Sequence, residues 1–215
     1  MGAGILPTTI YKNKLYFLFG KENQYEDSAR GFSDFGGGTD GGEDLLATAC
    51  REASEELTGF LGGPAEIRAM LEKSGTYTID YKTDGHGLYR MHIFHFPYNE
   101  CLPFYYNNNQ QFLQKHLDPA VIKRSKIFEK AEIAWFSLDE MMRRKSEFRH
   151  YFQNIVEIIH AQRDKIREFL RKGRAQGNRG TATAHKPHLN TVVCSSTPRR
   201  NRKTRRWGRR TRRWK

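Results

Sequence analysis

The chain of 215 residues lacks an apolar run of the eighteen or so residues that a membrane span needs. Its longest runs, such as Leu15–Phe19, have the length of a β-strand. The N-terminus lacks a basic region followed by an apolar segment, so we expect no signal peptide. Only three cysteines are present, and their spacing does not fit a metal site. These absences argue against a membrane-spanning, secreted or cysteine-ligated zinc protein, and we expect a cytoplasmic location.

Acidic residues are missing from the C-terminal part of the chain. From Arg171 onward there are sixteen Lys and Arg and no Asp or Glu. The first 170 residues hold the other 21 basic residues and all 24 acidic ones, which gives them a net charge of −3. The overall charge of +13 is therefore a property of the C-terminal tail alone.

The apolar content, 37% hydrophobic and 13% aromatic, is high enough for a packed core. We expect one domain over residues 1–172, followed by a flexible linker and arginine-rich tail over 173–215 that is disordered. The predicted elements of the domain are a hairpin or long strand at 10–20 with a turn at 12–14, a helix at 43–57 ended by Gly59, strands at 75–81 and 88–98, a strand at 132–136, and a long helix from a Ser137/Glu140 capping box to about 172. This order indicates an α/β fold, with a mixed sheet sandwiched between helices.

The region before the last strand is less clear. Residues 105–109, which are Tyr-Tyr-Asn-Asn-Asn, resemble an insertion, followed by a short helix at 111–117. Tyr105 and Tyr106 could stack on a nucleobase, although an ordinary polar surface loop is the simpler interpretation.

The segment Gly37–Gly59, GGTDGGEDLLATACREASEELTG, is the most informative part of the sequence. At about 100° per residue, Glu52, Glu55 and Glu56 fall within one face of the predicted helix. Arg51, four residues before Glu55, can pair with that carboxylate. Three carboxylates on one face repel one another, so the pattern favours a bound cation. Ligands that are all oxygen suit Mg²⁺ or Mn²⁺.

The spacing of these residues closely resembles the Nudix box, G-x5-E-x7-R-E-U-x-E-E-x-G-U, in which U is aliphatic. The matching positions are Gly37, Glu43, Arg51, Glu52, Glu55 and Glu56. Six fixed positions would coincide by chance on the order of once in ten million starts. There is one departure, since the box expects glycine at Thr58 and an aliphatic residue at Gly59.

The resemblance, which covers about residues 35–140, implies a Nudix-like α/β/α sandwich and a metal-dependent hydrolase that cleaves a phosphoanhydride. It implies that Glu52 and Glu56 bind the metal first, with Glu55 as a further ligand or an assisting group, and that the backbone carbonyl of Gly36 joins them. Arg51 and Glu43 would orient the catalytic helix.

Many Nudix enzymes add a glutamate about six residues before a late tryptophan, as a base or an extra ligand. Trp135 follows Glu129 by six residues and Glu132 by three. The resemblance therefore favours Glu129 over Glu132, and both could also be plain surface charges.

The tail has eleven Lys or Arg among its last seventeen residues, with two tryptophans between them. Arginines contact phosphates and tryptophans stack on exposed bases, so we expect nucleic acid, mainly RNA, as a partner. The residues concerned are Arg199, Arg200, Arg202, Arg205, Arg206, Arg209, Arg210, Arg212, Arg213, Trp207 and Trp214. A nuclear localisation signal or an anchor for other polyanions is the alternative.

Nudix enzymes cleave a nucleoside diphosphate linked to another group, X, and the box does not identify X. The tail favours 5′-capped RNA, as in the mRNA-decapping enzymes of large DNA viruses. Small nucleotides or diphosphoinositol phosphates are the alternative substrates. A non-catalytic RNA-binding module is the alternative from another functional class.

Overall fold

The computed structural model describes residues 1–23, 30–83, 87–125 and 129–177. The tail residues expected to bind RNA therefore lie outside the described residues, as does most of the expected linker. The elements are β1 (Gly2–Tyr11), β2 (Lys14–Glu22), β3 (Phe32–Ser33), β4 (Phe35–Gly38), α1 (Leu45–Glu56), α2 (Pro64–Ser74), β5 (Tyr77–Thr83), β6 (Gly87–His95), α3 (Cys101–His116), α4 (Pro119–Ser125), β7 (Lys130–Ser137), α5 (Leu138–Arg143), the 3-10 turn η1 (Lys145–Glu147), α6 (Phe152–Ala161) and α7 (Arg163–Gly177).

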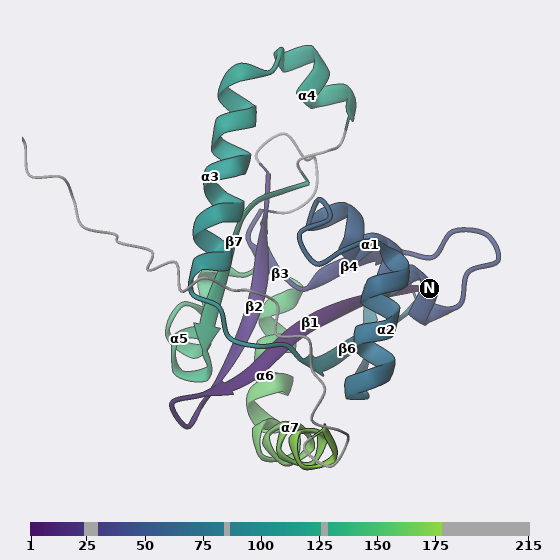
Figure 1. The fold of residues 1–215 in the computed structure, drawn as a ribbon, viewed down its shortest axis with the longest axis vertical. Helices are drawn as coiled ribbons and strands as arrows, with labels where there is room; N and C mark the ends of the chain where they lie inside the picture. Colours follow the sequence, from purple (N-terminus) through teal and green to yellow (C-terminus); the bar gives the residue numbers. More distant parts are fainter. Residues whose placement is uncertain (24–29, 84–86, 126–128, 178–215) are drawn as a thin grey trace, which may run out of the picture.

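A mixed sheet of seven strands forms the centre of the domain (Figure 1). Strand β1 pairs in parallel with β6 and antiparallel with both β4 and β2, while β7 pairs with β2 and β5 with β6. On the edge of β1 away from β6, β4 pairs with the first residues of the strand and β2 with the last ones. The strands β4 and β2 therefore share one edge of β1. Helix α1 lies against both β1 and β4 (Figure 1).

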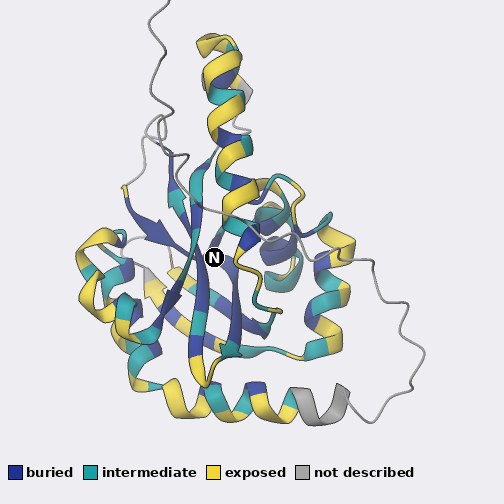
Figure 2. Cartoon of the chain, turned by 60° about the vertical axis from the view of Figure 1, so that its left-hand side comes forward, coloured by how far each residue is buried: buried dark blue, intermediate teal, exposed yellow. Residues whose placement is uncertain are grey.

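Each face of the sheet is covered by its own set of helices. One hydrophobic cluster joins the sheet to α6 and α7, and a second joins it to α1, α2 and α3. Figure 2 shows the buried strands between helices whose outer sides are exposed. The expected α/β/α sandwich with a mixed sheet is confirmed. No helix among the described residues is both long and apolar enough to cross a membrane.

Several expected elements are confirmed. The turn of the first hairpin falls at Lys12 and Asn13, whose φ angles of 45° and 61° are those of a tight hairpin turn. Helix α1 begins after Asp44, whose side chain accepts a hydrogen bond from Ala47 N–H at 2.6 Å. Strands β5 and β6 pair antiparallel as expected, and their connecting residues 84–86 lie outside the described residues.

The expected long helix after Ser137 is wrong, although its capping box with Glu140 is present. The chain instead forms α5, a 3-10 turn and two further helices. Phe148 interrupts the helix because it is buried among aromatic rings and forms a bridge with Phe32 of β3. A second break follows at Gln162, whose side chain accepts a hydrogen bond from Tyr77.

Two other elements differ from the sequence-based expectations. Residues 105–109 are not a loop, because α3 runs without interruption from Cys101 to His116. Helix α2 was not anticipated, although Pro64 at its first turn and the apolar pair Ile67 and Leu71 are typical helix signals.

The departure from the Nudix box lies in the turn after α1. Thr58 has a φ of 49° and Gly59 a φ of 75°, so two successive residues adopt the left-handed conformation. A β-branched residue such as threonine is strained there, whereas glycine is not. The departure thus affects the turn and leaves the carboxylates of α1 in place.

We expect Thr58→Gly to stabilise the protein by about 0.5–1 kcal/mol, because it removes this strain at the cost of some chain entropy. The hydrogen bond from Gln110 Nε2 to Thr58 Oγ1 is long, at 3.4 Å, so its removal should cost little. Chemical denaturation measures the change. Gly59→Ala is the matched control and should destabilise by a similar amount. A loss of stability in Thr58→Gly would show that the threonine side chain is needed.

Candidate active site

Polar side chains closely approach two of the three glycines of β4, Gly36 and Gly37. A Cβ added at Gly37 would lie 2.6 Å from the Glu52 carboxyl carbon. A Cβ at Gly36 would lie 2.2 Å from the Tyr89 hydroxyl oxygen. Any larger residue would displace one of these groups. Glycine is therefore required at Gly37 so that the Glu52 carboxylate can approach the backbone of β4, and at Gly36 so that the Tyr89 hydroxyl can do so.

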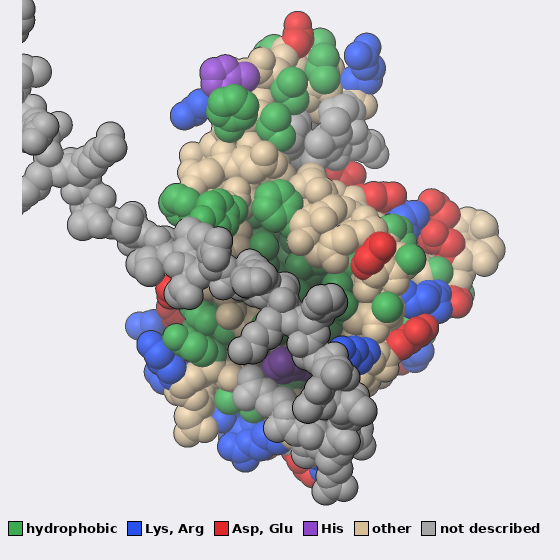
Figure 3. Space-filling model, viewed as in Figure 1, with side chains coloured by type: hydrophobic (Ala, Val, Ile, Leu, Met, Phe, Trp, Pro, Cys, Tyr) green, Lys and Arg blue, Asp and Glu red, His purple; other side chains and the backbone are tan. Residues whose placement is uncertain are grey.

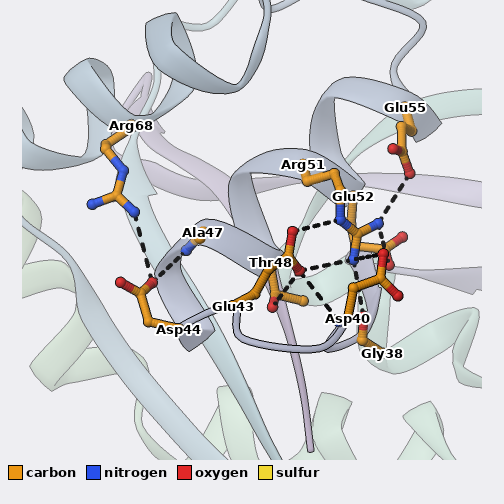
Figure 4. Close-up of polar contacts among 10 residues, drawn as sticks. All are labelled: Gly38, Asp40, Glu43, Asp44, Ala47, Thr48, Arg51, Glu52, Glu55 and Arg68. Carbon is orange, nitrogen blue, oxygen red and sulfur yellow. Dashed lines mark hydrogen bonds and ion pairs between the residues drawn. The ribbon is translucent and has the colours of Figure 1, made fainter.

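Arg51 of α1 lies among several acidic side chains and contacts them directly (Figure 4). Its Nε donates to Glu43 Oε1 at 2.9 Å and its Nη2 to Glu43 Oε2 at 3.1 Å. The hydrogen bonds from Arg51 lower the pKa of Glu43 to about 2. Arg51 Nη2 also donates to the carbonyl oxygen of Gly38 at 3.0 Å. One guanidinium thus joins α1, the loop before it and the end of β4.

The same guanidinium also holds two of the proposed metal ligands. Arg51 Nη1 lies 3.0 Å from Glu52 Oε1 and 3.2 Å from Glu55 Oε2. The Glu52 side chain is 14% exposed, whereas that of Glu55 is 55% exposed. Burial raises the pKa of Glu52, and the charge of Arg51 opposes this shift.

Glu56 points inward from the end of α1 and is buried. Its Oε2 accepts a hydrogen bond from the backbone N–H of Gly36 at 2.9 Å, and its Oε1 lies 3.0 Å from Lys130 Nζ. Burial raises the pKa of Glu56 well above its usual value, while the ammonium of Lys130 lowers it. The negative charges of Glu22 and Glu129 also raise this pKa.

Lys130 is a site residue that the sequence reasoning missed. Its side chain is only 1% exposed and contacts both Glu56 and Glu22, while Arg149 Nη1 donates to Glu22 Oε1 at 2.8 Å. Two buried carboxylates are thus balanced by two cations. The only sequence signal was a lysine within a predominantly apolar stretch before Trp135, which is too weak to identify a buried ion pair.

The two glutamates before Trp135 lie in different surroundings. Glu132 pairs across the sheet with Lys21 at 3.6 Å, and both side chains are 43% exposed. Lys21 lies over the Phe32 ring, in the core cluster on the α6 side of the sheet. The backbone carbonyl of Glu129 accepts a hydrogen bond from Asn23, and its charge acts on Glu56. Glu132 is thus paired with Lys21, whereas Glu129 adds negative charge near Glu56.

Helix α3 fixes the end of α1 from outside. The Tyr106 hydroxyl lies 2.8 Å from the backbone oxygen of Glu56 and 3.2 Å from that of Lys130, so it can donate to either. Tyr106 is fully buried, which excludes it from stacking on a nucleobase. Tyr105, its neighbour, is exposed.

The carboxylates of Glu52, Glu55 and Glu56 do not converge on one point. Among the described residues, no group of three His, Cys, Asp or Glu side chains is arranged to hold a metal ion. Glu52 and Glu55 are paired with Arg51, whereas Glu56 is paired with Lys130. The donor atoms nevertheless suit a hard divalent cation, because they are all oxygens and lie beside a glycine backbone that leaves space for them.

We expect Lys130→Met to destabilise the protein by about 3–5 kcal/mol, because it leaves buried carboxylates without their cation. Lys21→Met is the matched control. It breaks the exposed pair with Glu132, next to Glu22 on β2, and should cost less than about 1 kcal/mol. Urea denaturation of both variants measures the difference. Similar small effects would mean that Glu56 and Glu22 do not depend on Lys130.

No protein-family model matches the chain, and no curated protein matches it. Similar solved structures include a C. elegans Ap4A hydrolase in a binary complex, with 16% identity over 84% of this chain and 100% of that chain and a TM-score of 0.38. A second is a Nudix hydrolase from Nitrosomonas europaea, with 13% identity, 80% and 88% coverage and a TM-score of 0.37. A third is a bifunctional NMN adenylyltransferase/ADP ribose pyrophosphatase from Francisella tularensis, complexed with AMP and a manganese ion, with 15% identity, 75% and 41% coverage and a TM-score of 0.46. The identities and TM-scores of these similarities are low. The reaction of this chain must therefore be argued from its own residues.

Proposed function

We propose that this protein is a divalent-metal-dependent Nudix-type hydrolase that cleaves a phosphoanhydride of a nucleoside diphosphate linked to a further group. The observation that carries the proposal is the placement of Glu52 and Glu56 on α1 beside the glycine backbone of β4. Glu52 lies over Gly37, and Glu56 accepts a hydrogen bond from Gly36. Carboxylate oxygens held against a glycine strand are suited to bind a divalent cation, and that cation can in turn bind a phosphate group.

Glu52, Glu55 and Glu56, with the backbone carbonyl of Gly36, would hold Mg²⁺ or Mn²⁺. The ion would neutralise the diphosphate and lower the pKa of an attacking water. It would compete with Arg51 and Lys130 for the carboxylate oxygens that these cations now contact. Arg51 fixes the position of α1 relative to β4 through its hydrogen bonds to Glu43 and to the Gly38 carbonyl, so it acts as a positioning residue.

The favoured base is Glu129, which would accept a proton from the attacking water. Its support is the negative charge that Glu129 adds near the buried Glu56 carboxylate. Glu132 is instead held by Lys21 in an exposed pair.

The favoured substrate is 5′-capped RNA, which would make the protein a decapping enzyme. Its support is the distribution of charge, since the first 170 residues have a net charge of −3 and the rest is strongly basic. A long polyanion gains from the tail, whereas a small nucleotide can reach the site without it. Small-nucleotide or diphosphoinositol hydrolysis is the alternative.

Glu56→Gln and Glu52→Gln should each remove at least nine-tenths of hydrolysis at saturating metal. Glu52→Gln is the cleaner variant, because Glu56 also neutralises Lys130 and its loss affects stability. Turnover of a nucleotide panel with Mg²⁺ and with Mn²⁺ measures the effect, and a melting curve checks the fold. Normal turnover in both variants would refute the proposed ligands. Absence of turnover in the wild-type protein, with RNA binding retained, would favour a non-catalytic RNA-binding module.

Glu129→Gln should slow turnover by roughly a hundredfold, as expected for loss of a general base. Glu132→Gln is the control and should stay near the wild-type rate. The comparison uses single-turnover rates on one substrate. The reverse ranking would assign the base to Glu132, and two unaffected variants would place it elsewhere.

Deletion of residues 199–215 removes eleven positive charges and no proposed metal ligand. Binding of long RNA should weaken, and losing even four phosphate contacts should lower its logarithmic salt slope by roughly three. Turnover of a small nucleotide should barely change. Capped-RNA cleavage with and without the tail, at two salt concentrations, tests this. An unchanged salt response would leave the tail as a localisation signal or anchor.

A further inference from the structure

Helix α3 presents an exposed aromatic face to solvent. Phe104 is 48% exposed, Tyr105 46% and Phe112 60%. Tyr105 and Phe112 are seven residues apart, so they lie on the same side of the helix, about 10 Å apart along its axis. Together with α4, the outer part of α3 projects beyond the sheet (Figures 1 and 2). These rings are not needed to cover the core.

The polar residues on this face are amides and bases. Asn108, Gln111, Lys115 and His116 are all exposed on the same side as the aromatic rings. The His116 ring lies 4.5 Å from that of Phe112. From Cys101 to Leu117 the chain has no Asp or Glu. Figure 3 shows hydrophobic, basic and histidine side chains on this upper part of the molecule, with an acidic side chain at its tip.

The inner side of α3 is fixed close to the candidate site. The Tyr106 hydroxyl reaches the backbone of Glu56. The Asn107 amide donates to the carbonyl oxygen of Ile133 at 3.1 Å and accepts from its N–H at 2.8 Å. The amide thereby satisfies the backbone of β7 as a neighbouring strand would. The exposed face is thus held in a set position relative to α1.

The side chains on the outward face of α3 indicate which kind of partner it can bind. The basic tail would be repelled by Lys115, and a second copy of the same face would bring no acidic group to pair with it. Flat apolar rings suit the faces of nucleobases, amides suit their edges, and Lys115 suits phosphates. We propose that the outward face of α3 is a stacking surface for single-stranded nucleic acid. The proposal deepens the proposed function, because it gives an RNA substrate a contact on the body of the enzyme besides the tail.

The test compares the full-length protein with Tyr105→Ala/Phe112→Ala. The probes are an oligouridine and an abasic ribose-phosphate oligomer of the same length, and fluorescence anisotropy measures binding. We expect the affinity for oligouridine to fall by roughly tenfold or more, the size of one lost base stack. Affinity for the abasic oligomer should stay the same, and so should the salt slope for oligouridine, because the phosphate contacts remain.

Two further variants sharpen the result. Met142→Ala removes an exposed apolar side chain on α5 and should leave binding unchanged. Phe112→Trp should retain binding, because tryptophan also stacks on bases. Unchanged oligouridine binding in the double variant would overturn the proposal. An equal loss of affinity for both oligomers would also overturn the proposal. Competition by polyglutamate as strong as that by oligouridine would overturn it in favour of an acidic protein partner.

The inference and the proposed function can fail separately. Small-nucleotide turnover in the same preparations tests hydrolysis without this face. Turnover with no effect of the double variant on oligouridine binding removes the stacking surface and keeps the hydrolase. Base-dependent binding without any turnover removes the hydrolase and keeps the stacking surface.

Discussion

The arrangement of the site depends on how the buried charge of Glu56 is neutralised. A carboxylate with a side chain only 5% exposed needs a partner, and Lys130 supplies it. This pair joins the end of α1 to the start of β7, and the N–H of Gly36 adds β4. The Tyr106 hydroxyl of α3 lies within hydrogen-bond distance of the backbone oxygens of both charged residues and can donate to either. Four elements that are distant in sequence therefore meet around one ion pair.

The glycines of β4 are the second constraint, because they allow polar groups to approach the backbone from both sides of the sheet. Glu52 occupies the space over Gly37, while the Tyr89 hydroxyl lies beneath Gly36 and donates to Asp34 at 3.0 Å. Burial raises the pKa of Asp34 to about 6, although its hydrogen bond with Tyr89 opposes the shift. The absence of side chains at Gly36 and Gly37 thus brings three polar residues together around β4.

Charge is divided along the chain in a way that fits a polyanionic substrate. The carboxylates of α1 suit a metal ion but repel phosphates, and the first 170 residues have a net charge of −3. A long nucleic acid would gain its attraction from the tail, beyond the domain. On the domain itself, the outward face of α3 combines exposed rings with Lys115 and has no carboxylate. Catalysis and substrate retention would then depend on separate parts of the chain.

The sequence by itself determined the helix that bears Glu52 and Glu56, because the 3.6-residue period and the spacing from Gly37 are local properties. It also gave the first hairpin as one of two interpretations, with the turn at the place where Lys12 and Asn13 adopt positive φ angles. Tertiary structure alone decided two other features. It broke the expected last helix, because burying Phe148 against Phe32 outweighed helix propensity. It also brought Lys130 to Glu56, a contact between residues 74 positions apart that no local pattern encodes, since only the fold places the start of β7 at the end of α1.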